Sequence, residues 1–166
     1  FPPVHSESFD YPAGPLPSAL GAWQRVVNTD TAAEIARPKH SGGALRIIDD
    51  HSAAADATCR LRLPLATQPG QLRVSVRMMM TKGTCGAVAQ DMGLHLFGGG
   101  VLLDVFFSRG ELKTWQGTGW ASLEPPVKWQ DGRWYGLQIT VNPAMGMADL
   151  SVDGVPRKAV SLRRKA

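Results

Sequence analysis

The chain has few cysteines and no long apolar run. Its 166 residues include two cysteines and no Cys-x-x-Cys pair, so neither a thiolate metal cluster nor a dithiol redox motif is indicated. No stretch approaches the roughly 20 apolar residues that a helix needs to cross a bilayer. We therefore expect no membrane span.

No linker rich in proline, glycine and serine divides the sequence. A chain of 166 residues can bury roughly 70% of its unfolded surface, which is enough for one independent core. The 18 glycines and 12 prolines fall mostly between apolar runs, as expected for many short strands joined by turns. The sequence therefore predicts a single domain spanning residues 1–166.

Basic residues exceed acidic residues by 18 to 14, which gives a net charge of +4. Much of the surplus falls in residues 157–166, which hold Arg157, Lys158, Arg163, Arg164 and Lys165. A basic tail is usually solvated, and no aromatic and glycine pattern of an RNA- or DNA-reading module accompanies this one. We expect a basic tail near 157–166 and no nucleic-acid partner.

The clearest local pattern is alternation of apolar and polar residues. It is unbroken from residue 71 to 78, and it recurs in 134–142 and 147–152, a pair joined by a short turn and followed by Asp153-Gly154. Strands are predicted at residues 7–10, 23–27, 33–36, 44–48, 58–63, 71–79, 86–97, 101–107, 111–115, 134–142 and 147–152. With no helix among them, the predicted fold class is all-β, an antiparallel β-sandwich.

Two motifs bracket the chain. Gly132, Trp134, Tyr135 and Val141 form a G-x-W-Y-x-x-x-x-x-V strand that precedes a Val-Asp-Gly turn at 152–154. The opening segment 7–14, followed by Trp23, is similar to a first strand and loop. In these motifs the sequence resembles the concanavalin A-like lectin/glucanase superfamily, including its laminin-G-like and pentraxin-like branches. The resemblance implies a concanavalin A-like jelly roll, and it names a fold rather than an activity.

In that superfamily the concave sheet commonly carries the ligand, so the resemblance implies a ligand site among outward-facing side chains of the central strands. An Arg can bind a carboxylate or sulfate with two hydrogen bonds, and a Trp can stack on the apolar face of a sugar ring. The alternative is that an outward sheet face only needs polar residues to stay soluble. The candidates are Arg73, Arg77, His95, Asp104, Lys113, Trp115 and Gln138, together with Trp120 in a loop-rich stretch.

The resemblance favours a carbohydrate-binding, lectin-like module of an exported protein, extracellular or periplasmic, whose partner is a polysaccharide or glycoconjugate. Other domains of a larger chain are further expected partners. The E-x-D-x-x-E strand motif of β-glucan hydrolases is absent, so no catalytic residue is assigned. One alternative is a polysaccharide lyase or glycoside hydrolase acting on an acidic polysaccharide, with Arg73, Arg77 and His95 on one face. Another is an adhesion or structural module.

Two accessory features also follow from the resemblance. In an exported protein Cys59 and Cys85 would pair in a disulfide, the alternative being two buried free thiols. No cofactor is required, but related jelly rolls often hold a structural Ca²⁺ with oxygen ligands from an opening and a late strand. The carboxylates at those places are Glu7, Asp10, Asp149 and Asp153, each of which is alternatively a turn residue or a surface charge.

Overall fold

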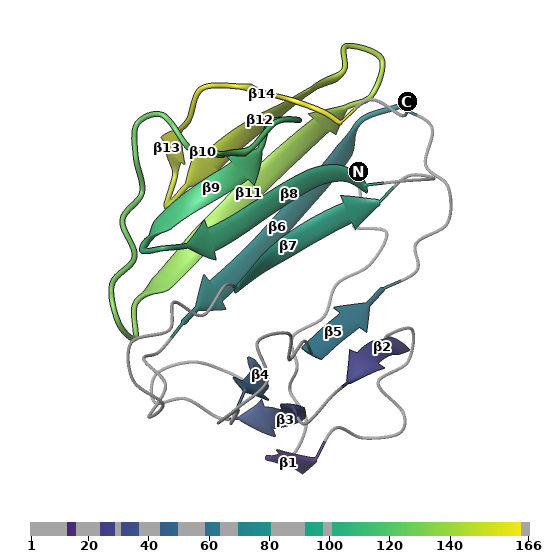
Figure 1. The fold of residues 1–166 in the computed structure, drawn as a ribbon, viewed down its shortest axis with the longest axis vertical. Coiled ribbons are helices and arrows are strands. Elements are labelled where there is room, and N and C mark those ends of the chain that lie inside the picture. The colour runs from purple at the N-terminus through teal and green to yellow at the C-terminus, as the bar shows by residue number, and fades with distance from the viewer. Residues whose placement is uncertain are drawn as a thin grey trace. The chain divides into compact units, whose positions relative to one another are not determined.

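The computed structural model describes residues 13–15, 24–28, 31–36, 44–49, 59–63, 70–80, 92–97 and 101–163 (Figure 1). Every regular element in these ranges is a strand, and every strand pair is antiparallel. The all-β prediction is therefore confirmed for this part of the chain, which contains no helix long and apolar enough to cross a bilayer. The chain divides into two compact units, Phe1–Thr67 and Gln68–Ala166. A single domain over 1–166 stays a prediction.

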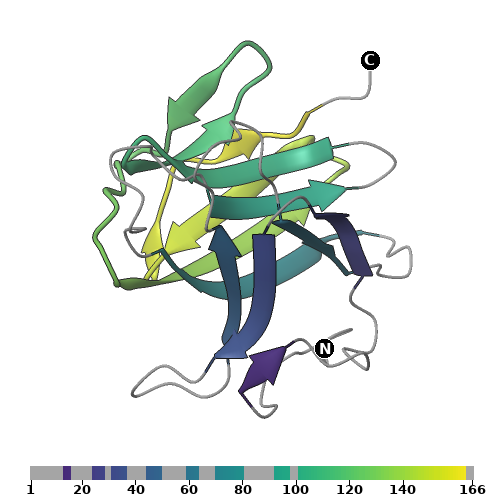
Figure 2. The same cartoon turned by 60° about the horizontal axis from the view of Figure 1, so that its bottom comes forward.

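The first unit contains two small sheets. One has the order β1-β3-β4, and the other pairs β2 with β5; the strands are β1 (Gly14–Pro15), β2 (Gln24–Asn28), β3 (Thr31–Ala36), β4 (Ala44–Asp49) and β5 (Cys59–Arg62). Figure 2 shows β3 and β4 side by side with the short β1 beyond them. Four of these strands were predicted with bounds shifted by a residue or two, and the predicted strand 7–10 lies outside the described residues.

The second unit is a sandwich of two sheets, drawn as two layers in Figure 1. The four-stranded sheet has the order β10-β9-β8-β7, with β7 (Met92–Phe97), β8 (Val101–Ser108), β9 (Glu111–Trp115) and β10 (Trp120–Ser122). The five-stranded sheet has the order β13-β12-β11-β6, and β14 also pairs with β12; its strands are β6 (Leu72–Met79), β11 (Trp134–Asn142), β12 (Met147–Val152), β13 (Val155–Pro156) and β14 (Val160–Ser161).

Alternate residues of each strand fill the space between the two sheets. Because successive side chains of a strand point to opposite faces, the apolar positions of the alternating patterns all meet in one core. In β8 the residues buried there are Leu103, Val105 and Phe107. The facing sheet contributes Tyr135, Leu137, Ile139, Val141, Ala148, Leu150 and Val152.

Residues 157–163 belong to this sandwich. Val160 and Ser161 form β14 and pair with β12, and the Leu162 N–H donates to the Gly146 carbonyl at 2.8 Å. Val160 and Leu162 are buried in the core. The expectation of a solvated tail was wrong for this segment because two apolar residues stand between its charges, and their burial outweighs the tendency of the charges to stay in water.

Candidate ligand-binding face of the four-stranded sheet

The side of the four-stranded sheet that faces away from the core carries both polar and aromatic residues. His95 of β7 lies directly opposite Asp104 of β8, and Trp115 of β9 lies directly opposite Trp120 of β10. Because paired residues of antiparallel strands project to the same side of a sheet, these side chains share one surface. We call it the four-stranded outer face; it comprises Gly93, His95, Phe97, Leu102, Asp104, Phe106, Glu111, Lys113, Trp115, Trp120 and Ser122.

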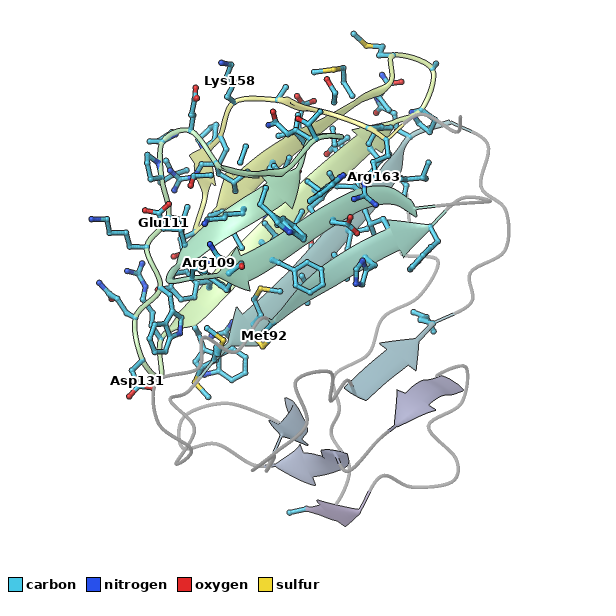
Figure 3. All side chains as sticks on the ribbon, in the orientation of Figure 1. Met92, Arg109, Glu111, Asp131, Lys158 and Arg163 are labelled. Atoms are coloured by element: carbon cyan, nitrogen blue, oxygen red, sulfur yellow. The ribbon has the colours of Figure 1, made fainter. Side chains whose placement is uncertain are left out.

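Asp104 joins two basic side chains at the centre of this face. Its Oδ1 lies 2.5 Å from His95 Nδ1, and its Oδ2 lies 3.1 Å from Arg163 Nη1. The Asp104 side chain is only 4% exposed, whereas those of His95 and Arg163 are 29% and 31% exposed. A carboxylate withdrawn from water to this extent requires charged or hydrogen-bonding partners. His95 and Arg163 supply them and still reach solvent. Figure 3 shows Arg163 over the four-stranded sheet.

The contact with Asp104 sets the role of each His95 nitrogen. An ionised carboxylate only accepts hydrogen bonds, so Nδ1 carries the proton and donates it to Asp104. In the neutral ring, Nε2 is then left with a lone pair. Within the described ranges Nε2 has no hydrogen-bond partner. His95 therefore presents a ring nitrogen of defined chemistry to a ligand on this face.

Aromatic rings flank His95 on both sides. The centroid of its ring lies 4.6 Å from that of Phe106 and 5.7 Å from that of Phe97. Phe106 leans across its neighbour Gly93, where an added Cβ would stand 2.4 Å from the Phe106 Cγ atom. The missing side chain of Gly93 is therefore what allows Phe106 to lie beside His95.

The row of rings continues across β9 and β10. Phe106 meets Trp120 with centroids 5.6 Å apart, and Trp120 meets Trp115 at 5.5 Å. The guanidinium of Arg163 lies 5.1 Å from the centre of the Trp115 ring, in a cation–π contact. The aromatic row thus returns to the polar cluster through Arg163. Phe97, at one end of the row, and Trp120, within it, are the most exposed of these rings.

Lys113 and Glu111 complete the charged groups of the four-stranded outer face. Glu111 accepts a hydrogen bond from the Ser122 hydroxyl at 2.5 Å. Lys113, opposite both Phe106 and Ser122, has no ion pair within the described ranges. Among the candidates from the sequence, His95, Asp104, Lys113, Trp115 and Trp120 are thus brought together on this face.

The remaining candidates, Arg73, Arg77 and Gln138, lie on the other sheet. Arg77 of β6 is opposite Gly136 of β11, and Gln138 is opposite Ser75, all turned away from the core. The hydrophobic core separates them from His95. The prediction that Arg73, Arg77 and His95 share one face was therefore wrong. Alternation tells which side of its own strand a residue occupies, but it does not tell which sheet the strand joins.

Arg163, Phe97 and Phe106 were absent from the candidates drawn from the sequence. Phe106 stands between the core residues Val105 and Phe107 in an apolar run, so the sequence does not distinguish it from a buried residue. Arg163 was assigned to a solvated tail. Val160 and Leu162 alternate with Ser161 and Arg163, but two apolar residues are too few for their periodicity to indicate a strand.

The predicted disulfide and calcium site fall largely on residues outside the described ranges. Cys59 begins β5, but Cys85 lies outside, so their pairing stays a prediction. Glu7 and Asp10 also lie outside. The two oxygens of Asp153 are occupied, one by the Gly136 N–H at 2.7 Å and one by Arg133 at 3.0 Å. The described ranges hold no group of three or more His, Cys, Asp or Glu arranged for a metal. Calcium stays a prediction, without support from Asp153.

No protein-family model, curated protein or solved structure matches the chain. The residues of the four-stranded outer face determine what it can bind. They offer hydrogen-bond donors and a free ring nitrogen at the centre, with apolar rings on either side.

Proposed function

We propose that the chain is a carbohydrate-binding, lectin-like module that holds a glycan on the four-stranded outer face. The observation that carries this proposal is the His95–Asp104–Arg163 cluster set within a row of partly exposed aromatic rings. A sugar ring has an apolar C–H face that stacks on aromatic rings, and hydroxyl groups that need donors and acceptors. Trp115 and Trp120 supply aromatic rings for the apolar face, and the His95–Asp104–Arg163 cluster supplies hydrogen-bonding groups for the hydroxyls.

The finer fold assignment belongs to the same proposal. A concanavalin A-like jelly roll is supported by two antiparallel sheets that share one core and by ligand-binding chemistry gathered on one of them. A module of this kind acts outside the cytoplasm, so an extracellular or periplasmic location is part of the proposal.

Trp120→Ala is expected to weaken glycan binding by at least about tenfold, because it removes an exposed ring that lies between Phe106 and Trp115 in the aromatic row. The Trp120 side chain is 43% exposed, so its loss leaves the core intact. A ligand is first identified by screening glycan arrays and insoluble polysaccharides, and its affinity is then measured by calorimetry.

The matched control is Met145→Ala. Met145 is 72% exposed in the turn between β11 and β12 and is also a large apolar side chain. The Met145 variant should bind as the unaltered chain does. Undiminished binding by Trp120→Ala would contradict the placement of the glycan on this face, and failure of the unaltered chain to bind any glycan would contradict the function.

Acid–base chemistry on an acidic polysaccharide is a second candidate function. The observation that favours it is the fixed orientation of His95, whose Nδ1–H donates to Asp104 and whose Nε2 is free to accept a proton. Arg163 forms an ion pair with the same Asp104 carboxylate and places a cation in this site. Arg73 and Arg77 lie on the other sheet.

A lyase leaves an unsaturated sugar end that absorbs ultraviolet light, and uronate polymers can be screened for that absorbance. If the chain is a lyase, His95→Ala should abolish the signal, because it removes the base, and Asp104→Asn should diminish it. Activity that persists in His95→Ala would rule out this site as its source. If no uronate polymer gives new ultraviolet absorbance, the lyase hypothesis is contradicted and glycan binding is left as the function.

A further inference from the structure

The outer face of the five-stranded sheet has a hollow of its own. It measures about 320 Å³ and is lined by Ser75, Val76, Arg77, Gly136, Leu137, Gln138, Asp153 and Gly154. Gly136 keeps it open, because this residue has no side chain at a position that faces outward between Arg77 and Asp153. The core of the sandwich separates this hollow from the four-stranded outer face.

Arg77 stands at this hollow with its charge uncompensated. Its side chain is exposed, and no acidic group in the described part of the chain forms an ion pair with it. Its guanidinium lies 5.3 Å from the centre of the Trp134 ring. Stacking on an aromatic ring fixes the orientation of the guanidinium group. The N–H groups at the edge of the guanidinium can still donate hydrogen bonds to a ligand.

The carboxylate that lines the hollow is already neutralised. Asp153 accepts the Gly136 N–H through one oxygen and pairs with Arg133 through the other. Gln138 accepts a long hydrogen bond from the Ser151 hydroxyl, at 3.5 Å, through its carbonyl oxygen. The Gln138 amide NH₂, the Ser75 hydroxyl and the Arg77 guanidinium are then left as donors.

We propose that this hollow is a second binding site, which takes an oxoanion, a carboxylate or a sulfate, carried by a sugar-sized ligand. An oxoanion accepts the hydrogen bonds that Arg77, Ser75 and Gln138 offer and supplies the negative charge that Arg77 lacks. Its volume of about 320 Å³ is at the lower end of the range for small-molecule sites, so the hollow has room for one charged sugar unit. A neutral sugar lacks the charge, so the site discriminates acidic from neutral sugars.

The test is a titration of the isotope-labelled chain, followed by NMR, with a monosaccharide sulfate, the matching uronic acid and the neutral parent sugar. Sulfate and carboxylate forms should shift the amide signals of Gly136 and Gly154, and the neutral sugar should not. Arg77→Gln should weaken binding by at least about tenfold, as expected for the loss of a charged hydrogen bond. Gly136→Val, which fills the hollow and removes no charge, should weaken it as well.

Arg73→Gln is the matched control. Arg73 lies on the same strand and the same face, four residues from Arg77, which is about 13 Å along a strand. Salt screens charges at that distance, so binding should change less than about twofold. An equal loss in Arg73→Gln and Arg77→Gln would overturn the site in favour of general charge attraction. Equal shifts with the neutral sugar, or no shifts at Gly136 and Gly154, would also overturn it.

Discussion

Arg163→Ala is expected to lower the free energy of unfolding by about 2–4 kcal/mol. The substitution leaves one oxygen of the Asp104 carboxylate without its charged partner, in a side chain that is 4% exposed. Removing one member of a buried ion pair is costly because the other charge stays behind without compensation. The same change frees His95 to move with Asp104, so glycan binding should fall too. Chemical denaturation measures the first effect and calorimetry the second.

Two comparisons separate this explanation from a general loss of charge. Arg133→Ala breaks the pair with Asp153, which at 3.0 Å is about as short as the 3.1 Å Arg163–Asp104 pair, but the Arg133 and Asp153 side chains are 48% and 37% exposed, so the loss should stay below about 1 kcal/mol. Adding Asp104→Asn to Arg163→Ala removes the orphaned charge and should recover part of the stability. A double variant less stable than Arg163→Ala alone would contradict the ion-pair explanation.

Arg163 also connects the two sheets, which is why one residue affects both stability and the site. It follows β14, which pairs with β12 of the five-stranded sheet. Its own N–H donates to the Leu102 carbonyl of β8 at 2.8 Å, and its side chain reaches Asp104 on the same strand. The segment from Val160 to Arg163 therefore links the two sheets by hydrogen bonds, and its last residue completes the polar cluster.

Much of the second unit follows directly from the sequence. Strands β9, β11 and β12 have the predicted bounds, and β6 and β8 differ by one residue at one end, because strict alternation over five or more residues leaves little freedom in which face is buried. The short strands β10, β13 and β14 were not predicted. Two or three residues carry too little periodicity to be recognised, and these strands exist because a long neighbour offers them backbone partners.

The candidate site was predicted only in part, for a related reason. Alternation identified His95 and Asp104 as outward residues, and the register of β7 and β8 then made them neighbours. No local signal states which strands are adjacent in a sheet, so Arg77 was grouped with His95 although the core lies between them. Arg163 was missed because its contribution depends on a contact with β8, some sixty residues away along the chain.

Gly93→Ala is expected to destabilise the sandwich by about 3 kcal/mol and to disrupt the aromatic row. A Cβ at Gly93 would stand 2.3 Å from the Val105 carbonyl oxygen and 2.4 Å from Phe106 Cγ. The ring can turn aside, but the carbonyl belongs to the paired strand and can move only if β7 and β8 separate locally. Overpacking usually costs about 1–3 kcal/mol of stability. We expect a loss at the upper end of this range because the clash is with a backbone carbonyl rather than a flexible side chain.

Displacement of Phe106 also removes the ring that joins His95 to Trp120, so glycan affinity should fall together with stability. Gly119→Ala is the matched control, because a Cβ at Gly119 meets no atom within 4 Å, and its stability should change by less than about 0.5 kcal/mol. Denaturation curves and calorimetry on both variants measure the two effects. If Gly93→Ala proves as stable as Gly119→Ala, β7 and β8 do not pair as closely as the structure places them.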